Sequence, residues 1–186
     1  MNYVYHGSHV SNLKQIVPNH STHGEMWVYA SFSKAVSLIF LSNRGNDLYY
    51  YLAGDGSIKY PLVLVERKKD MFKEIFNVQG SLYTLSSKNF MSGKTGWSAE
   101  VVSNKDEEVL LEEHIDNVFE KLKKLNKIGE LKLYLYPDRP KYIPKDNSDL
   151  IPKVIRWQKR GINIEMFFKI YPELKEKYDK TLEDDK

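Results

Sequence analysis

The sequence predicts an α+β fold, in which a body of mostly antiparallel strands with short helices is followed by a helical tail. The chain has 186 residues, of which 41% are hydrophobic, so it is long enough for one domain with a buried core. Strand patterns dominate residues 1–136 and do not alternate regularly with helices, which argues against a doubly wound parallel sheet. Residues 137–147 hold three prolines and predict an extended connector, after which the pattern becomes helical.

Eight short segments are predicted as strands because they are rich in Val, Tyr, Leu and Ile and are bounded by turn residues. The alternation of apolar and polar residues is cleanest at 131–136. The continuous apolar run in 61–66 predicts a strand that is buried on both faces. The expected strands are 2–5, 27–31, 48–52, 61–66, 81–85, 100–103, 109–115 and 131–136.

Helices are predicted where a capping residue precedes apolar residues spaced three and four apart. Ser33 is expected to cap one helix of the body and Asp116 to begin another, which Gly129 ends. Residues 68–76 are either a short helix or a long loop. The expected helices are 13–17 after Ser11, 33–41 and 116–128 in the body, and 149–160, 163–170 and 172–180 in the tail. The expected turns and loops are 6–8, 19–25, 43–46, 53–56 and 92–96.

The composition excludes several classes of protein. The chain has no cysteine, so disulfide frameworks, thiolate zinc sites, iron–sulfur clusters and cysteine nucleophiles are all ruled out. The longest apolar run, around residues 35–41, falls far short of the roughly 20 residues that span a bilayer. The N-terminus does not resemble a secretory signal. We therefore expect a cytoplasmic protein without a membrane partner.

Common catalytic and metal-binding motifs are absent. The sequence contains no P-loop, no G-x-G-x-x-G fingerprint and no G-x-S-x-G nucleophile elbow. Two histidine pairs, His6 with His9 and His20 with His23, have a spacing of three residues. That spacing points side chains to opposite faces of a strand, and in a loop it has no fixed geometry. We therefore expect no bound metal.

Basic residues are concentrated in the second half of the chain. The formal net charge is +3, and residues 121–160 hold 12 basic and 4 acidic side chains. Such a stretch can bind an anionic partner such as nucleic acid. A solvated helix face with ordinary loop lysines explains the same composition, and Tyr142 and Trp157 are too sparse for a stacking platform.

Three short motifs resemble one known fold. They are Tyr5-His6-Gly7-Ser8 on the first expected strand, Val28-Tyr29-Ala30-Ser31 before an expected helix, and Glu100 at the start of a late strand. Their order is similar to that of the ADP-ribosyltransferase fold, in the His-Tyr-Glu branch of diphtheria-toxin-like and poly-ADP-ribose-polymerase-like enzymes. The resemblance covers roughly residues 1–136, with residues 137–186 as a helical extension packed on the same domain. It implies a split, mostly antiparallel sheet and a compact, toxin-like bacterial or phage enzyme.

The resemblance implies that NAD is the co-substrate and binds in a cleft between two small sheets. The backbone of Gly7 would contact the nicotinamide carboxamide, because a residue without a Cβ admits such close approach. His6 would hydrogen-bond a ribose hydroxyl, and Tyr29 would stack on the nicotinamide ring. Glu100 would be the main catalytic residue, since its carboxylate would stabilise the positive charge that develops on the ribose when nicotinamide leaves.

The same resemblance adds three residues to the expected NAD site. Ser8 completes the first motif, and the hydroxyl of Ser31 would support the nicotinamide pocket. Tyr83 is a candidate for a second ring against the nicotinamide, although ordinary packing explains this tyrosine equally well. Ser98 stands where arginine-modifying relatives carry a glutamate or glutamine, so the resemblance does not extend to arginine as the acceptor.

Three hypotheses of different classes follow from these observations. The first is an NAD-dependent enzyme that transfers ADP-ribose to an unknown macromolecular acceptor, either protein or nucleic acid. The second is a catalytically inactive module of the same fold that binds a nucleotide or nucleic acid. The third is a structural or interaction protein, in which the first motif is only a strand followed by a glycine turn and Glu100 is a solvated glutamate. Binding and turnover of NAD distinguish the three.

Overall fold

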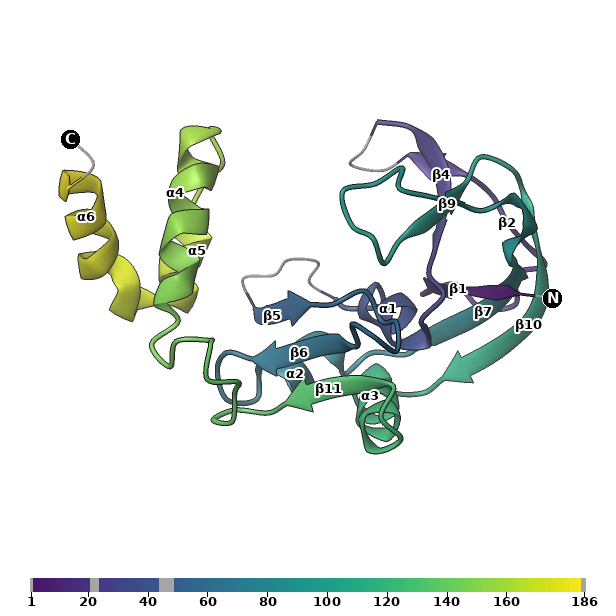
Figure 1. Cartoon of the computed structure of the whole chain (residues 1–186), viewed down its shortest axis with the longest axis horizontal. Helices are drawn as coiled ribbons and strands as arrows, with labels where there is room; N and C mark the ends of the chain where they lie inside the picture. Colours follow the sequence, from purple (N-terminus) through teal and green to yellow (C-terminus); the bar gives the residue numbers. More distant parts are fainter. Residues whose placement is uncertain (1, 21–23, 44–48, 185–186) are drawn as a thin grey trace. The chain divides into compact units, whose positions relative to one another are not determined.

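The computed structural model describes residues 2–20, 24–43 and 49–184. Within these residues the fold is α+β, with several antiparallel sheets and six α-helices. The chain divides into two compact units, residues 1–136 and residues 137–186. The described strands all belong to the first unit, and the second is helical (Figure 1). None of the helices in the described ranges is both long and apolar enough to cross a membrane.

The first unit contains three small sheets whose strands are far apart in the sequence. Neighbouring strands pair antiparallel, except that β11 runs parallel to β6. The four-stranded sheet has the order β1 (Tyr3–Ser8), β7 (Gly80–Ser86), β10 (Glu107–Ile115) and β2 (Gln15–Ile16). The three-stranded sheet has the order β11 (Leu131–Tyr134), β6 (Leu62–Glu66) and β5 (Tyr50–Ala53). A second four-stranded sheet has the order β3 (Asn19–His20), β4 (Met26–Ala30), β9 (Val101–Ser103) and β8 (Met91–Ser92).

The helices of the first unit begin at capping residues. The Ser33 hydroxyl accepts a hydrogen bond from the Val36 amide at 3.4 Å, as predicted for the start of α1 (Lys34–Ile39). The cap of α3 (Val118–Lys127) is Asn117 rather than Asp116. The remaining helices of this unit are α2 (Met71–Phe76) and the 3-10 turn η1 (Ser87–Asn89).

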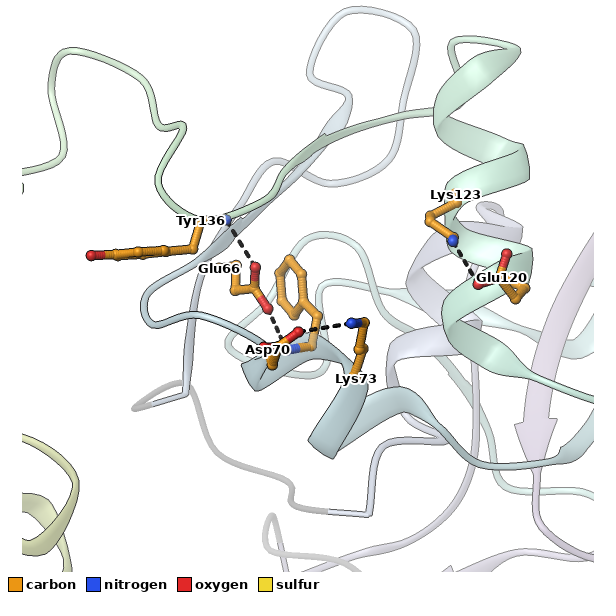
Figure 2. A network of polar contacts seen from close by, with 7 residues as sticks. Glu66, Asp70, Lys73, Glu120, Lys123 and Tyr136 are labelled. Atoms are coloured by element: carbon orange, nitrogen blue, oxygen red, sulfur yellow. Dashed lines mark hydrogen bonds and ion pairs between the residues drawn. The ribbon is translucent and has the colours of Figure 1, made fainter.

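The carboxylate of Glu66 links three elements at the end of β6. It accepts hydrogen bonds from the backbone amides of Phe72, in α2, and Tyr136, just beyond β11, both at 2.8 Å (Figure 2). Glu66 is only 5% exposed, so these two bonds replace the water that the carboxylate loses on folding. Of residues 68–76, for which a helix or a loop was expected, only 71–76 form a helix, and the Glu66 carboxylate satisfies an amide in its first turn.

A compact hydrophobic cluster fills the space between the two four-stranded sheets. It combines residues of β1, β2, β4, β7 and β9, which the strand pairing brings together. Its buried members are Val4, Ile16, Val28, Ala30, Tyr83, Leu85 and Val101. The cluster therefore fixes the relative position of β1 and β4, the strands that carry the two longer motifs.

The structure corrects two N-terminal predictions. Residues 6–8 do not end the first strand, because β1 continues through Ser8 in register with β7. Residues 13–17 are not a helix: Asn12 has a left-handed backbone with φ of 63°, and Gln15 and Ile16 pair with β10. Smaller differences affect the expected loops, since β3 and β8 occupy parts of 19–25 and 92–96. Residues 44–46 and Leu48, where a loop and a strand start were expected, lie outside the described residues.

The second unit consists of short helices that follow the proline-containing connector. Several apolar side chains of the tail are buried, namely Leu150, Ile151, Val154, Ile155, Phe167, Leu174 and Tyr178. Phe168 contacts the rings of both Phe167 and Tyr178, with each pair of centroids 5.0 Å apart. The helical elements are η2 (Ser148–Leu150), α4 (Ile151–Lys159), α5 (Glu165–Ile170), η3 (Pro172–Leu174) and α6 (Lys175–Asp184).

Candidate functional site

The two longer motifs meet where β1 and β4 touch. Tyr5 and Ser31 form an isolated antiparallel bridge, with N···O distances of 2.7 and 2.9 Å. The hydroxyl of Ser37, in α1, also donates to the Tyr5 carbonyl at 2.7 Å. Ser31 is 1% exposed, and its own hydroxyl accepts a hydrogen bond from the Ser33 amide. The bridge therefore holds the first and second motifs side by side.

Gly7 presents its backbone on the open edge of β1. In an antiparallel pair the backbone groups of successive residues point alternately toward and away from the partner strand. Because the amide and carbonyl of Tyr5 point to Ser31, those of Gly7 also point away from β7, on the same side as β4. Among the described residues, none hydrogen-bonds to these two groups of Gly7. A planar amide could pair with them there.

The absence of a side chain at Gly7 has a second cause, which sequence reasoning missed. A Cβ at this position would lie 2.3 Å from the Ser37 carbonyl oxygen and 3.3 Å from Leu41 Cγ. Helix α1 thus packs directly on the backbone of β1. Glycine is required here for helix packing, whether or not a ligand approaches from the strand edge.

His6 is held by the backbone of the second motif. Its Nδ1 lies 2.7 Å from the carbonyl oxygen of Tyr29. Because a carbonyl can only accept, Nδ1 carries the proton and Nε2 has a lone pair when the ring is neutral. Burial lowers the pKa of His6 from its ordinary value of 6.5, against the weaker opposite effect of the Tyr29 carbonyl. The ring is therefore neutral at pH 7, with Nε2 as a hydrogen-bond acceptor.

Glu100 lies directly before β9, the strand that pairs with β4. Val28, Tyr29 and Ala30 pair with residues 103, 102 and 101 of β9, so continuing the register places Glu100 opposite Ser31. Figure 1 shows β9 beside β4. Ser31 directly follows Ala30 and Glu100 directly precedes Val101, so both lie at the same end of the β4–β9 pairing. Glu100 is 8% exposed, and no described residue hydrogen-bonds to its carboxylate.

The loop before Glu100 is anchored by Trp97. The indole Nε1 donates to the Gly54 carbonyl at 3.2 Å, and the ring lies 6.1 Å from that of Phe40. The Trp97 carbonyl in turn accepts a hydrogen bond from the Glu100 amide at 3.1 Å. Sequence reasoning missed Trp97, although a tryptophan three residues before the expected catalytic glutamate, in a loop rich in glycine, was a visible signal.

Two expected NAD-site residues have structural roles. Tyr83 is 0% exposed, and its hydroxyl donates to the Val10 carbonyl at 2.8 Å and accepts from the Leu13 amide at 3.2 Å. Its ring thus lies in the core with no face for nicotinamide, so the stacking role expected for Tyr83 is not supported. The Ser8 hydroxyl accepts from the Val10 amide at 3.1 Å and helps turn the chain after β1.

Glu112, in β10, secures the loop that follows β1 and was not singled out from the sequence. Its carboxylate accepts from the Asn12 amide at 3.0 Å and from the Ser81 hydroxyl at 2.7 Å, and it lies 3.1 Å from the Tyr83 hydroxyl, whose single proton it shares with the Val10 carbonyl. These bonds, that of Ser81 first, lower the pKa of Glu112 below its usual value. The partners lie on β7 and in the loop after β1, 29 to 100 residues away in the sequence, so no local signal marks Glu112.

The histidine pairs do not form a metal site within the described residues. In that part of the chain no group of three or more His, Asp or Glu side chains could hold a metal ion. Nδ1 of His6 is hydrogen-bonded to the Tyr29 carbonyl, and Nδ1 of His9 lies 3.3 Å from the Gln79 carbonyl. His20 is on β3, and His23 lies outside the described residues.

Comparison of the chain with protein-family models, with curated proteins and with solved structures gave no match. The functional argument therefore depends on the arrangement of His6, Gly7, Tyr29, Ser31 and Glu100. His6, Gly7 and Tyr29 lie on β1 and β4, Ser31 directly follows β4, and Glu100 directly precedes β9. The Tyr5–Ser31 bridge, the His6–Tyr29 hydrogen bond and the β4–β9 pairing bring the segments that carry these residues next to one another.

Proposed function

We propose that this protein is an NAD-dependent ADP-ribosyltransferase-like enzyme, which releases nicotinamide and transfers ADP-ribose to an acceptor. The observation that supports this most is the position of Glu100. Glu100 as a residue is 8% exposed, and no described residue donates a hydrogen bond to its carboxylate, whose oxygens stay accessible and without a protein partner. A ribose hydroxyl and the positive charge that develops beside it would supply that partner.

The neighbouring groups suit the other parts of NAD. The amide and carbonyl of Gly7 on the open edge of β1 are complementary to the nicotinamide carboxamide, which has one acceptor and two donors. Tyr29 lies two residues before Ser31, which bridges to Tyr5, and we expect its ring to stack on the nicotinamide. The lone pair on Nε2 of neutral His6 can accept from a ribose hydroxyl.

The reaction needs little covalent participation by the protein. The bond between nicotinamide N1 and ribose C1′ breaks, and nicotinamide leaves with the electron pair as a neutral molecule. Glu100 stabilises the positive charge on the ribose, more strongly in the transition state than in the ground state. A nucleophile of the acceptor then bonds to C1′ and loses its proton, for which Glu100 is a suitable base. No metal is needed in this scheme.

The test is release of nicotinamide from NAD by the wild-type chain and by Glu100→Gln. The amide keeps the size of the side chain but removes its charge, so NAD binding is retained and turnover falls by about 10²-fold or more. Isothermal titration with NAD gives the affinity, and chromatography gives the nicotinamide released. Binding without turnover by the wild-type chain would favour the inactive nucleotide-binding module, and absence of NAD binding would contradict both.

A further inference from the structure

The structure divides the basic stretch 121–160 between the two units, and its parts differ in how their charges are paired. On α3, Lys121 forms an ion pair with Glu113, and Lys123 pairs with Glu120 at 2.5 Å. On α4, neither Arg156 nor Arg160 forms an ion pair with any described residue. Lys121 and Lys123 are thus paired within the fold, whereas Arg156 and Arg160 have no ion-pair partner among the described residues.

Basic and aromatic side chains share one face of α4. Residues three, four and seven positions apart lie on the same side of an α-helix. We define the α4 basic face as Lys153, Arg156, Trp157 and Arg160. Both arginines are exposed, and the lysine and the tryptophan are half-buried. The opposite side of the helix carries the buried residues Ile151, Val154 and Ile155.

The charges of this face lie close together, and the acidic residue nearest to them in the sequence is Asp149, four residues before Lys153. Residues 150–164 contain four basic residues and no Asp or Glu. The Lys153 ammonium lies 5.3 Å from the centroid of the Trp157 ring. Burial, and then the positive charge of Arg156, lower the pKa of Lys153 below its usual value. An anion bound at this face would reduce that repulsion.

We propose that the α4 basic face binds single-stranded nucleic acid, with Arg156 and Arg160 on successive phosphates and the Trp157 ring against an unpaired base. The two arginines are one helical turn apart, about 6 Å along the axis, so they can contact neighbouring phosphates of an extended strand. Arginine and an aromatic ring together are the usual elements of single-strand binding. A membrane surface fits less well, because the apolar side of α4 is buried and cannot insert into lipid.

The test measures fluorescence anisotropy of a labelled oligouridylate with the full chain at several salt concentrations. Arg156→Gln/Arg160→Gln should weaken binding by tenfold or more at low salt. It should also reduce the slope of log K against log salt by about 1.4, since each phosphate contact on a single strand contributes about 0.7. The matched control is Lys123→Gln/Lys124→Gln on α3, which removes the same charge and should change the affinity by less than about twofold.

Trp157→Ala separates stacking from charge. It should weaken binding by about fivefold or more and leave the salt slope unchanged. Circular dichroism of each variant checks that the helices remain folded. If Trp157→Ala unfolds the second unit, Trp157→Phe is used instead, because it keeps an aromatic ring at this position. The proposal is wrong if the oligonucleotide does not bind, or if the α3 control loses as much affinity as the arginine variant. It is also wrong if duplex RNA binds as well as the oligouridylate and Trp157→Ala has no effect on affinity. Binding of phosphatidylserine vesicles through the same arginines, without binding of the oligouridylate, would likewise contradict it. These results do not depend on NAD turnover.

Discussion

Nδ1 of His6 donates a hydrogen bond to the carbonyl oxygen of Tyr29 over 2.7 Å, and this bond joins the first motif to the second. It orients the imidazole and leaves Nε2 as the acceptor, so the backbone of one motif sets the chemistry of a side chain in the other. The two strands are also held by the Tyr5–Ser31 bridge. Four predictions test this arrangement and the packing that supports it.

Acidification should destabilise the protein through His6. The pKa of His6 is lowered in the folded state, so between that pKa and the unfolded value of 6.5 the unfolded chain binds more protons. Stability should therefore be greatest above pH 6.5 and fall as the pH drops through this window. Urea unfolding of wild type and His6→Gln from pH 5 to 7.5 measures the effect, and the variant should have the flatter profile. An NMR titration that gives His6 a pKa above 6.5 would contradict the prediction.

Gly7→Ala should destabilise the fold even without a ligand. The new Cβ would lie 2.3 Å from the Ser37 carbonyl oxygen, so α1 or β1 must shift, at a cost of about 1–3 kcal/mol. Gly96→Ala is the control, because no atom lies within 4 Å of a Cβ at that position, and its effect should stay within about 0.5 kcal/mol. Chemical denaturation measures both, and equal effects would refute the packing argument.

Glu66→Ala should be more damaging than loss of a surface ion pair. It leaves the amides of Phe72 and Tyr136 without their acceptor and should cost about 2–4 kcal/mol. Lys123→Gln breaks the exposed pair with Glu120, also visible in Figure 2, and should cost less than about 1 kcal/mol. Thermal unfolding compares the two variants. A similar loss in both would show that the Glu66 contacts contribute little.

Tyr29→Ala should weaken NAD binding, whereas Tyr29→Phe should keep it. A ring stacked on nicotinamide contributes to binding in the ground state and in the transition state alike, so alanine should raise KM and leave kcat nearly unchanged. This pattern differs from the loss of kcat expected for Glu100→Gln. Steady-state kinetics of nicotinamide release measure both constants. If phenylalanine is as harmful as alanine, the hydroxyl and not the ring is the important group.

Local patterns in the sequence predicted much of the fold. Ser33 begins a helix, the apolar run in 61–66 becomes the buried strand β6, and Gly129 follows the last turn of α3 with φ of 82°. In each case the deciding residues are neighbours along the chain, so propensity and capping determine the structure. Such patterns also placed Tyr29 on a strand, and they placed Glu100 at the start of a strand that the structure begins one residue later, at Val101.

Long-range contacts decided the predictions that were wrong or incomplete. Leu13, Ile16 and Val17 have helical spacing, but the amide of Leu13 bonds to Tyr83, and Asn12 bonds to Glu112. These partners lie 70 and 100 residues away, beyond the reach of any local pattern. The same contacts hold the Tyr83 ring in the core. Its predicted position on a strand did not show that the ring would be buried.

The double constraint on Gly7 bears on how such a protein would change over evolutionary time. Its missing side chain is needed both by the packing of α1 and by the proposed approach of a ligand to the strand edge. A descendant that no longer used NAD would still retain this glycine, because any larger residue would damage the fold. Glu100 has no such second role, because no described residue hydrogen-bonds to its carboxylate. In a lineage that abandons catalysis, the glutamate is therefore the first of the two to be replaced.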